Sequence, residues 1–245
     1  MRADLFLVEK GYARSREDAK RSILAGLVTV DGKTVCKPSE NIDPDAAGEV
    51  RFNRTIPYVG RGGLKLEAAL DRFGIGVGGL TAVDIGASTG GFTDCLLRRG
   101  AARVFAVDSG HGQLAPELLA DPRVISMEGF NARYLTPEDL GGRVDVAVID
   151  VSFISQTLIH RAVSSVLIPG GVFVSLIKPQ FECGRREVGK GGLVRDPAAR
   201  NKAVDLVVAS ASDNSLVCRG FFESPVKGGD GNTEYLAVFI RGNND

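Results

Sequence analysis

From residue 80 onward, short and almost continuous apolar runs alternate with stretches whose apolar residues have helical spacing. The runs are 80–85, 103–108, 144–150 and 172–177. Runs of this kind are typical of strands that are buried on both faces of a mostly parallel sheet. Two later runs, 215–223 and 234–241, are joined by a glycine-rich segment, which predicts an antiparallel pair. The pattern therefore indicates an α/β domain.

The first part of the chain has sparser apolar positions and denser charge. Apolar spacing over 5–24 predicts two short amphipathic helices, and Ser15 is a suitable N-cap for the second. Residues 28–30 and 34–35 flank the dipeptide Asp31-Gly32, which favours the tight turn of a β-hairpin. We therefore expect three parts: a small α+β domain at 1–52, a linker at 53–57 and a large domain at 58–245.

Composition excludes several classes of protein. Hydrophobic residues make up 44% and charged residues 24% of 245 positions, close to the globular average. Thirty Lys and Arg balance thirty Asp and Glu, so any surface for nucleic acid has to be a local patch. No apolar run approaches the ~20 residues of a membrane helix, and the first residues lack the apolar stretch of a signal peptide. We expect a cytoplasmic protein without a membrane partner.

The cysteines and histidines give no sign of a metal site or a disulfide framework. The four cysteines form no Cys-x-x-Cys pair, and the two histidines have no further ligand at metal spacing. We therefore expect no metal, and we expect the cysteines to be small core residues in a reducing compartment.

A glycine-rich turn at 86–91 follows the first apolar run and precedes a predicted helix over 91–99. In an α/β sheet this place lies at the carboxyl end of the first strand, where nucleotides bind. The spacing G-x-x-x-G-G differs from dinucleotide and P-loop patterns, which disfavours a diphosphate ligand. Asp84 and Asp108, each near the end of a run, suit a ligand with an amino group and a ribose diol. S-adenosylmethionine has both features.

We therefore predict an S-adenosylmethionine site at this turn. The residues expected to line it are Asp84, Gly86, Ser88, Thr89, Gly90, Gly91, Phe92 and Asp108. Taken alone, the motif is also compatible with an ordinary strand–turn–helix unit in which glycine serves only packing. Phe92 and Phe153 either flank the adenine or a flipped base, or pack in the core, which is the commoner fate.

Four charged residues stand at predicted strand ends or on a predicted helix: Lys65, Asp150, Lys178 and Glu234. Parallel strands end at the same edge of a sheet, so Asp150 and Lys178 should face the crevice beside Gly86. Methyl transfer to an alkyl hydroxyl requires a base, and a lysine can serve only if its pKa is far below the usual ~10.4. Burial and a second cation lower a lysine pKa, so two lysines and two carboxylates could share this work. Taken singly, each is more often an ordinary salt-bridge partner.

Five segments carry a family resemblance: Arg61–Leu66, Asp84–Asp94, Asp150–Ser155, Leu176–Glu182 and Gly231–Tyr235. In order and spacing they resemble the TlyA-type ribosomal RNA 2'-O-methyltransferases, also called haemolysin A, over nearly the whole chain. The resemblance implies a Rossmann-like, FtsJ-type sheet of seven strands, mostly parallel with the last strand antiparallel. It also implies a preceding small α+β RNA-binding domain of the ribosomal-protein type. Gly60 and Cys183 depart from the residues expected in the family.

The resemblance further implies a function. Lys65, Asp150, Lys178 and Glu234 would form the family's Lys-Asp-Lys-Glu tetrad, with Lys178 as general base. The reaction would be S-adenosylmethionine-dependent methylation of a cytidine ribose in ribosomal RNA, with free rRNA or a ribosomal subunit as partner. The segment 182–196 is similar to the family's glycine-rich basic loop, which suits a phosphate backbone. The modified subunit and the oligomeric state stay open.

Positive charge is concentrated near the start of the chain. Residues 1–37 contain eight Lys and Arg against five Asp and Glu, several of them around the start of the second predicted helix. Alone, this pattern indicates a phosphate-binding surface or a solvated helix face equally well. With the resemblance we expect RNA contacts from Arg2, Arg14, Arg16, Lys20, Arg21, Arg61, Arg185, Arg186 and Lys190.

Three other functions are compatible with parts of the sequence. A methyltransferase for small molecules would leave the basic N-terminal domain unexplained. A membrane-active haemolysin would need a spanning or long amphipathic helix, which the sequence does not indicate. A non-catalytic ribosome-binding module would have no use for both lysines and both carboxylates.

Overall fold

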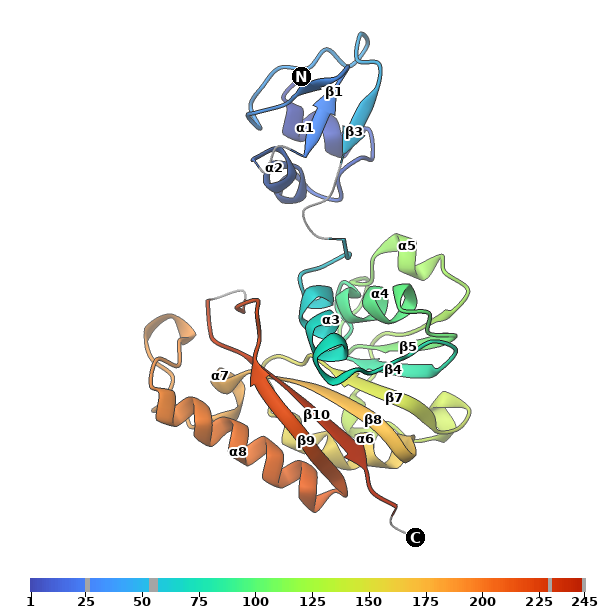
Figure 1. The fold of residues 1–245 in the computed structure, drawn as a ribbon, viewed down its shortest axis with the longest axis vertical. Coiled ribbons are helices and arrows are strands. Elements are labelled where there is room, and N and C mark those ends of the chain that lie inside the picture. The colour runs from blue at the N-terminus through green and yellow to red at the C-terminus, as the bar shows by residue number, and fades with distance from the viewer. Residues whose placement is uncertain (25–26, 53–56, 229–230, 244–245) are drawn as a thin grey trace. The chain divides into compact units, whose positions relative to one another are not determined.

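The computed structural model describes residues 1–24, 27–52, 57–228 and 231–243. The chain forms two compact units, residues 1–57 and 58–245 (Figure 1). Most of the expected linker, residues 53–56, lies outside the described residues. So does Gly26, whose position just after the apolar spacing at 5–24 predicts the end of the second helix.

The N-terminal unit contains two helices and a small antiparallel sheet. Its elements are α1 (Ala3–Glu9), α2 (Arg16–Leu24), β1 (Val28–Val30), β2 (Lys33–Thr34) and β3 (Val50–Phe52), with strand order β2-β1-β3. The two predicted helices and the hairpin are confirmed. Ser15 Oγ accepts a hydrogen bond from the Asp18 N–H at 3.2 Å, and Asp31 and Gly32 have φ values of 50° and 77°. Strand β3 was not predicted, because it has only three residues, none of them buried.

The larger unit is built on a seven-stranded sheet. The strands are β4 (Thr81–Ile85), β5 (Arg103–Val107), β6 (Val124–Met127), β7 (Val144–Ile149), β8 (Leu167–Ile177), β9 (Leu216–Glu223) and β10 (Tyr235–Arg241). Their order is β6-β5-β4-β7-β8-β10-β9, and β10 runs antiparallel to both of its neighbours. The predicted fold class, including the antiparallel last strand, is therefore confirmed.

Two strands differ from the prediction. Strand β6 was not predicted; it is a short edge strand with half-exposed and exposed residues. Strand β8 starts at Leu167, before the predicted run 172–177, because Leu167 still pairs with Val144 of β7 across a shift in register.

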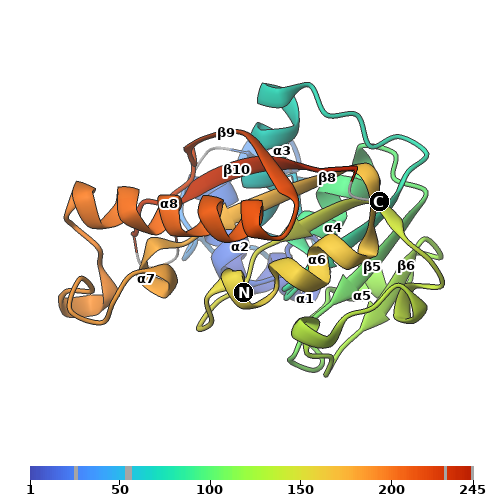
Figure 2. The same cartoon turned by 90° about the horizontal axis from the view of Figure 1, so that it is seen from below.

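Helices cover both faces of the sheet (Figures 1 and 2). The helices are α3 (Gly62–Phe73), α4 (Gly91–Arg98), α5 (Pro116–Leu119), α6 (His160–Val166), α7 (Pro179–Glu182) and α8 (Pro197–Asp213). Short 3-10 turns are η1 (Ala132–Tyr134), η2 (Glu138–Leu140), η3 (Gln156–Leu158) and η4 (Lys190–Gly192). The strand order reverses direction between β4 and β7, and in open α/β sheets ligands bind in the crevice at this point.

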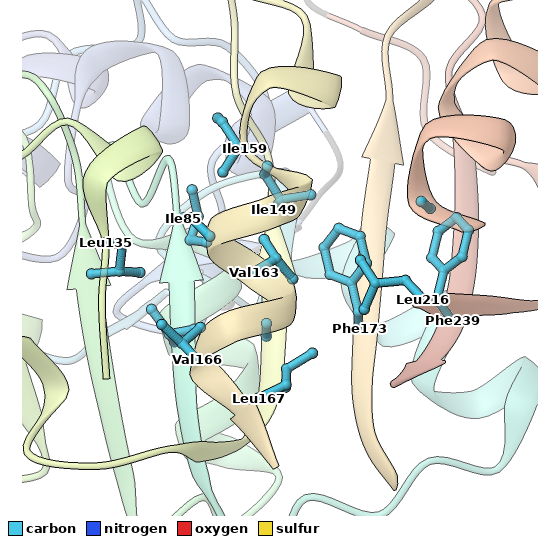
Figure 3. Packing of buried hydrophobic residues seen from close by; sticks show 14 of the residues in the cluster. Ile85, Leu135, Ile149, Ile159, Val163, Val166, Leu167, Phe173, Leu216 and Phe239 are labelled. Atoms are coloured by element: carbon cyan, nitrogen blue, oxygen red, sulfur yellow. The ribbon is translucent and has the colours of Figure 1, made fainter. Parts of the chain in front are cut away.

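An apolar core between the sheet and helices α6 and α8 supports this crevice (Figure 3). Ile85 and Ile149 end the two central strands, and Phe173 of β8 stacks on Phe239 of β10 with ring centroids 5.4 Å apart. All four side chains are fully buried. The core therefore fixes the strand ends from which the charged residues of interest emerge.

The remaining sequence expectations concern single residues. Cys95 is buried as expected of a core residue, but Cys36 is exposed, so the expectation was wrong there because the residue lies beyond the β1–β2 hairpin. His160 is buried and contacts Ser210 at 3.0 Å, and burial lowers its pKa to about 4. Among the described residues, no helix has both the length and the apolar character needed to cross a membrane.

Candidate active site

The turn between β4 and α4 lies directly against the end of β7. Gly86 has a φ of 83°, and a Cβ at this position would lie 2.5 Å from the carbonyl oxygen of Asp150. The Gly86 N–H donates to the Val107 carbonyl at 2.8 Å, so the turn is also attached to β5. Only glycine combines this backbone conformation with so close an approach. The glycine of the sequence motif therefore brings three strand ends together.

A cavity of about 450 Å³ opens at these strand ends. Its lining includes Gly86, Ser88, Asp108, Gln113, Asn131 and Asp150. Among the described residues that line it there are two carboxylates but no Lys or Arg. The cavity therefore suits an uncharged or positively charged nucleoside better than a nucleotide with phosphates.

Asp108 is the carboxylate at the end of β5. Its two oxygens accept the N–H groups of Ser88 at 2.8 Å and of Gly110 at 2.7 Å. An ionised carboxylate offers about four acceptor positions, so each oxygen can still accept from a hydroxyl. The residues present thus fit S-adenosylmethionine, with its ribose diol, its amino group and its positive sulfonium.

A second cavity, of about 180 Å³, shares Gly86, Ser88, Asp150 and Ser152 with the first. In contrast to the larger cavity, it is also bordered by two cations, Arg61 and Lys178. The predicted residues Thr89, Gly91 and Phe92 line this cavity rather than the larger one. The two cavities therefore meet at Asp150 and differ in charge.

The four charged residues from the sequence form two ion pairs. Lys178 Nζ lies 2.5 Å from Asp150 Oδ1 and donates to Ser152 Oγ at 2.9 Å. Lys65 Nζ lies 2.5 Å from Glu234 Oε2, and both side chains of this pair are buried. Tyr235 of β10 is paired with Ile177 of β8, and the two strands are antiparallel. Glu234, which precedes Tyr235, and Lys178, which follows Ile177, therefore lie at the same end of these neighbouring strands.

Close packing of α3 on α4 brings the first pair to this edge. A Cβ at Gly91 would lie 3.1 Å from the Gly63 backbone nitrogen and 3.3 Å from the Gly62 Cα. Small residues on both helices therefore allow their backbones to approach, and α3 carries Lys65 and, just before its start, Arg61. The structure thus places all four charged residues at one end of the sheet.

Two of the residues expected to line the cofactor site line neither cavity. Asp84 is fully buried beneath the turn and accepts from Thr93 Oγ1 at 2.7 Å, and Gly90 packs against Leu118. Burial raises the pKa of Asp84 to about 7, while the bond from Thr93 opposes this shift. Asp84 therefore supports the turn from below rather than facing a ligand.

The segment after Asp150 carries an exposed aromatic ring. Phe153 is 92% exposed, has a φ of 64°, and lies 5.2 Å from the ring of Phe181 between centroids. Phe92, by contrast, is buried as its core interpretation expects. An exposed ring at the rim of a cavity is suited to stacking on a planar ligand.

The glycine-rich loop is attached to Asn232, in the segment that leads into β10 and contains Glu234. Asn232 Oδ1 accepts from the Val194 N–H at 3.0 Å, and its Nδ2 donates to the Gly192 carbonyl at 2.9 Å. The three cations expected to contact RNA from this loop, Arg185, Arg186 and Lys190, are all exposed. The sequence analysis did not single out Asn232; its position two residues before Glu234 was the available signal.

In the N-terminal unit, a buried carboxylate organises two of the expected RNA-binding residues. Asp4 is fully buried, and it accepts from Arg2 at 2.9 Å and from Arg16 at 3.1 Å. The Arg2 guanidinium lowers the pKa of Asp4 to about 2, although burial acts in the opposite direction. Both arginine side chains remain about half exposed, so they can still contact another molecule.

The other expected cations lie nearby on or before α2. Lys20 is partly exposed and lies 4.0 Å from Glu17, and Arg21 is half-buried. The Arg14 backbone N–H donates to Asp18 Oδ2 at 3.2 Å. These contacts place the cations on and beside one helix of the N-terminal unit.

Comparison with known proteins gives two family matches. The FtsJ-like methyltransferase family matches residues 58–241, and the S4 domain family matches residues 1–47. The chain is 47% identical over 236 residues to the putative rRNA methyltransferase YqxC of Bacillus subtilis, covering 96% of this chain and 84% of that protein. It is 45% identical to the 16S/23S rRNA (cytidine-2'-O)-methyltransferase TlyA of Mycobacterium tuberculosis, covering 96% and 88%.

Among solved structures, a putative hemolysin from Streptococcus thermophilus is similar over the whole chain. The TM-score is 0.76 at 44% sequence identity, and the similarity covers 100% of this chain and 89% of that one. The matches therefore extend over both units of the chain.

The buried Asp84 generates a prediction for stability. Because burial raises its pKa to about 7, the folded protein retains a proton that the unfolded chain, with an aspartate pKa of ~3.9, has already released. This contribution to stability is complete below about pH 4 and is lost as the pH rises through about 7. The Asp84→Asn variant has no such loss. The difference in free energy of unfolding, variant minus wild type, should therefore increase by about 2–3 kcal/mol from pH 5 to pH 8. Urea denaturation at the two pH values measures this difference.

Asp205→Asn, on the exposed face of α8, is the matched control and should keep the wild-type pH dependence. If wild type and Asp84→Asn depend on pH in the same way, Asp84 does not titrate in this range.

Proposed function

This chain belongs to the FtsJ-like methyltransferases, enzymes that use S-adenosylmethionine, and we propose that it methylates the ribose 2'-hydroxyl of a cytidine in ribosomal RNA. One observation carries the proposal: a cavity with two carboxylates and no lining cation among the described residues meets a smaller cavity that is bordered by Lys178 and Arg61. The first suits a cationic methyl donor and the second an anionic polynucleotide. The names of both curated relatives given above refer to rRNA methylation, that of TlyA to the 2'-oxygen of cytidine, and the S4 match agrees with an RNA substrate.

The larger cavity would hold the cofactor. Asp108 would accept hydrogen bonds from the ribose diol, and Gly86 would let the ligand approach the backbone of the turn. Bound there, S-adenosylmethionine supplies an electrophilic methyl group. Asp150 borders both cavities, so its carboxylate would also lie near the positive charge of the donor.

Lys178 is the proposed general base. Its amine borders the smaller cavity, where it would accept the proton of the attacking 2'-hydroxyl. Asp150 and Ser152 hold the amine in place from two sides. As a general base Lys178 would act in its neutral form, whose two N–H groups can bind Asp150 and Ser152 and whose lone pair then remains for the hydroxyl proton. Fixing the amine in this way reduces the entropic part of the barrier.

The buried pair of Lys65 and Glu234 has a supporting part in this proposal. It links α3 to the residue just before β10, next to the end of β8 that Lys178 follows. Removing either partner would leave an uncompensated buried charge, which is strongly destabilising. We therefore assign this pair chiefly to holding the edge of the sheet in shape.

Several exposed groups of the larger unit would bind the RNA. Arg61 lies at its border, and Arg185, Arg186 and Lys190 are exposed on the glycine-rich loop, where they can contact phosphates. Phe153 would stack on the target base once that base has left its helix. The N-terminal S4 domain would contribute further phosphate contacts.

The Lys178→Ala variant tests the proposed reaction. With labelled S-adenosylmethionine and undermodified ribosomal subunits or naked rRNA, we expect wild type to place the label on a ribose 2'-oxygen of a cytidine. Lys178→Ala should lower the rate by at least about 100-fold, because a general base contributes this much to the rate. Cofactor affinity should stay within about threefold of wild type, because Lys178 does not line the larger cavity.

Arg219→Ala, an exposed cation on strand β9, is the matched control and should retain wild-type activity. Label on a base or on protein would contradict the proposed function, and full activity of Lys178→Ala would contradict only the assignment of the base.

Charge changes on α2 test the RNA surface. Lys20→Glu should weaken RNA binding by about tenfold at low salt and reduce the dependence of log K on log salt by about one unit for each phosphate that the variant leaves unbound. Arg16→Gln is preferable to a reversal at that position, because a glutamate would lie beside the buried carboxylate of Asp4. Filter binding across a salt series measures both variants.

Cofactor affinity serves as the internal control and should not change in either variant. Unchanged RNA affinity in both would remove this helix from the RNA-binding surface.

A further inference from the structure

A buried hydrogen-bond network holds the segment that follows Asp150. Glu182, the last residue of α7, is 9% exposed, and its two carboxylate oxygens accept from two different groups. Ser155 Oγ donates to one oxygen at 2.5 Å, and the Gln156 N–H donates to the other at 3.0 Å. One carboxylate thus binds two consecutive residues of a loop that lies 26 and 27 positions earlier in the chain.

The side chain of Gln156 continues the network to strand β8. It is 1% exposed; its Nε2 donates to the Leu176 carbonyl at 3.3 Å, and its Oε1 accepts from Ser175 Oγ. Leu176 lies two residues before Lys178, and Glu182 lies four residues after it. The loop is therefore attached to the chain on both sides of Lys178.

The stretch between Asp150 and these attachment points carries groups that border the cavities. Ser152 accepts a hydrogen bond from Lys178, and Phe153 presents its ring to solvent. Phe153 has a φ of 64°, which a bulky residue adopts only at a cost, and its ring gains little from burial in return. Such a conformation persists where the surrounding contacts hold the backbone firmly in place. The fully paired network next to it provides that constraint.

We propose that Glu182 is a positioning residue: through Ser155 and Gln156 it fixes the loop from Asp150 to Phe153 against Lys178. The inference rests on the proposed function, since it concerns how the groups assigned there are held. None of Glu182, Ser155 and Gln156 lines either cavity, so the network acts without touching cofactor or substrate. Its consequence is that the amine, the Asp150 carboxylate and the Phe153 ring meet the target nucleotide in one arrangement.

Three variants test the proposal at saturating RNA and cofactor in single-turnover methylation. Glu182→Ala removes both acceptors and should slow the chemical step by about 10- to 100-fold, because small displacements of reacting groups cost this much. Glu182→Gln should stay within about threefold of wild type, since its carbonyl can accept from the Gln156 N–H while its amide donates to Ser155 Oγ. Ser155→Ala removes one hydrogen bond and should slow the step by about three- to tenfold.

Binding measurements separate positioning from a loss of folded protein. Stoichiometry of S-adenosylmethionine binding should stay at the wild-type value in every variant. Affinities for S-adenosylmethionine and RNA should fall by less than the rate of the chemical step, because groups such as Gly86 and Asp108 still line the larger cavity. Glu138→Ala, an exposed glutamate on η2, is the matched control and should be fully active. If Glu182→Ala does not fold, the rate of Ser155→Ala and the rescue in Glu182→Gln decide the question.

Several results would overturn the inference. A wild-type rate in Glu182→Ala, or a wild-type rate in Ser155→Ala where Glu182→Ala does not fold, would show that the network does not position the reacting groups. A parallel loss of rate and cofactor binding would reduce the role to folding, and a Glu182→Gln variant as slow as Glu182→Ala would assign it to charge. Wild-type and Lys178→Ala proteins in the same assay keep the proposals apart: an inactive wild type would refute the proposed function, whereas an active one with an unaffected Glu182→Ala would refute only this inference.

Discussion

The arrangement of the site depends on one close contact, between the turn that follows β4 and the residue that ends β7. The carbonyl oxygen of Asp150 occupies the space that a side chain at Gly86 would need, and the Asp150 N–H donates to the Ile85 carbonyl at 2.9 Å. Because no side chain separates the two strand ends, Asp150 lies beside Gly86 in the wall of the larger cavity. A methyl donor in that cavity and a base beside Asp150 can then act on the same hydroxyl.

Charge divides this shared space into two parts. The larger cavity is lined by Asp108 and Asp150, whereas Lys178 and Arg61 border only the smaller one. In the proposed arrangement a cationic donor and an anionic polynucleotide would therefore each meet the opposite charge, and each would be disfavoured in the other's place. Asp150 belongs to both cavities, so it can balance the positive charge of Lys178 and that of a donor. This double position is a stronger argument for its importance than the ion pair alone, because isolated ion pairs are common on protein surfaces.

Sequence patterns predicted most strands of the larger sheet, because burial on both faces leaves long apolar runs in the central strands. They failed at β3 and β6, which are short and only half covered, so side-chain burial leaves little trace in their composition. Among the proposed site residues, strand-end position was enough to predict that Asp150 and Lys178 lie together. It misled for Asp84, since a carboxylate at the same end of a strand can face the core as readily as the ligand. The partners of Glu182 lie far from it in sequence and show no motif, so only the fold reveals that they meet.

Unfavourable features are concentrated at one edge of the sheet. Asp84 is buried without a cationic partner among the described residues, Lys65 and Glu234 are withdrawn from water, and Phe153 has a strained backbone with its ring exposed. Each costs stability, and each lies at or directly beneath the strand ends that carry the proposed site. The apolar core beneath the strand ends supplies the compensating free energy, because its side chains are fully buried and closely packed (Figure 3). The rigid core below the strand ends and the fully paired polar network beside the loop thus have the same effect. Both prevent this end of the sheet from relaxing into a more stable arrangement that would no longer align the reacting groups.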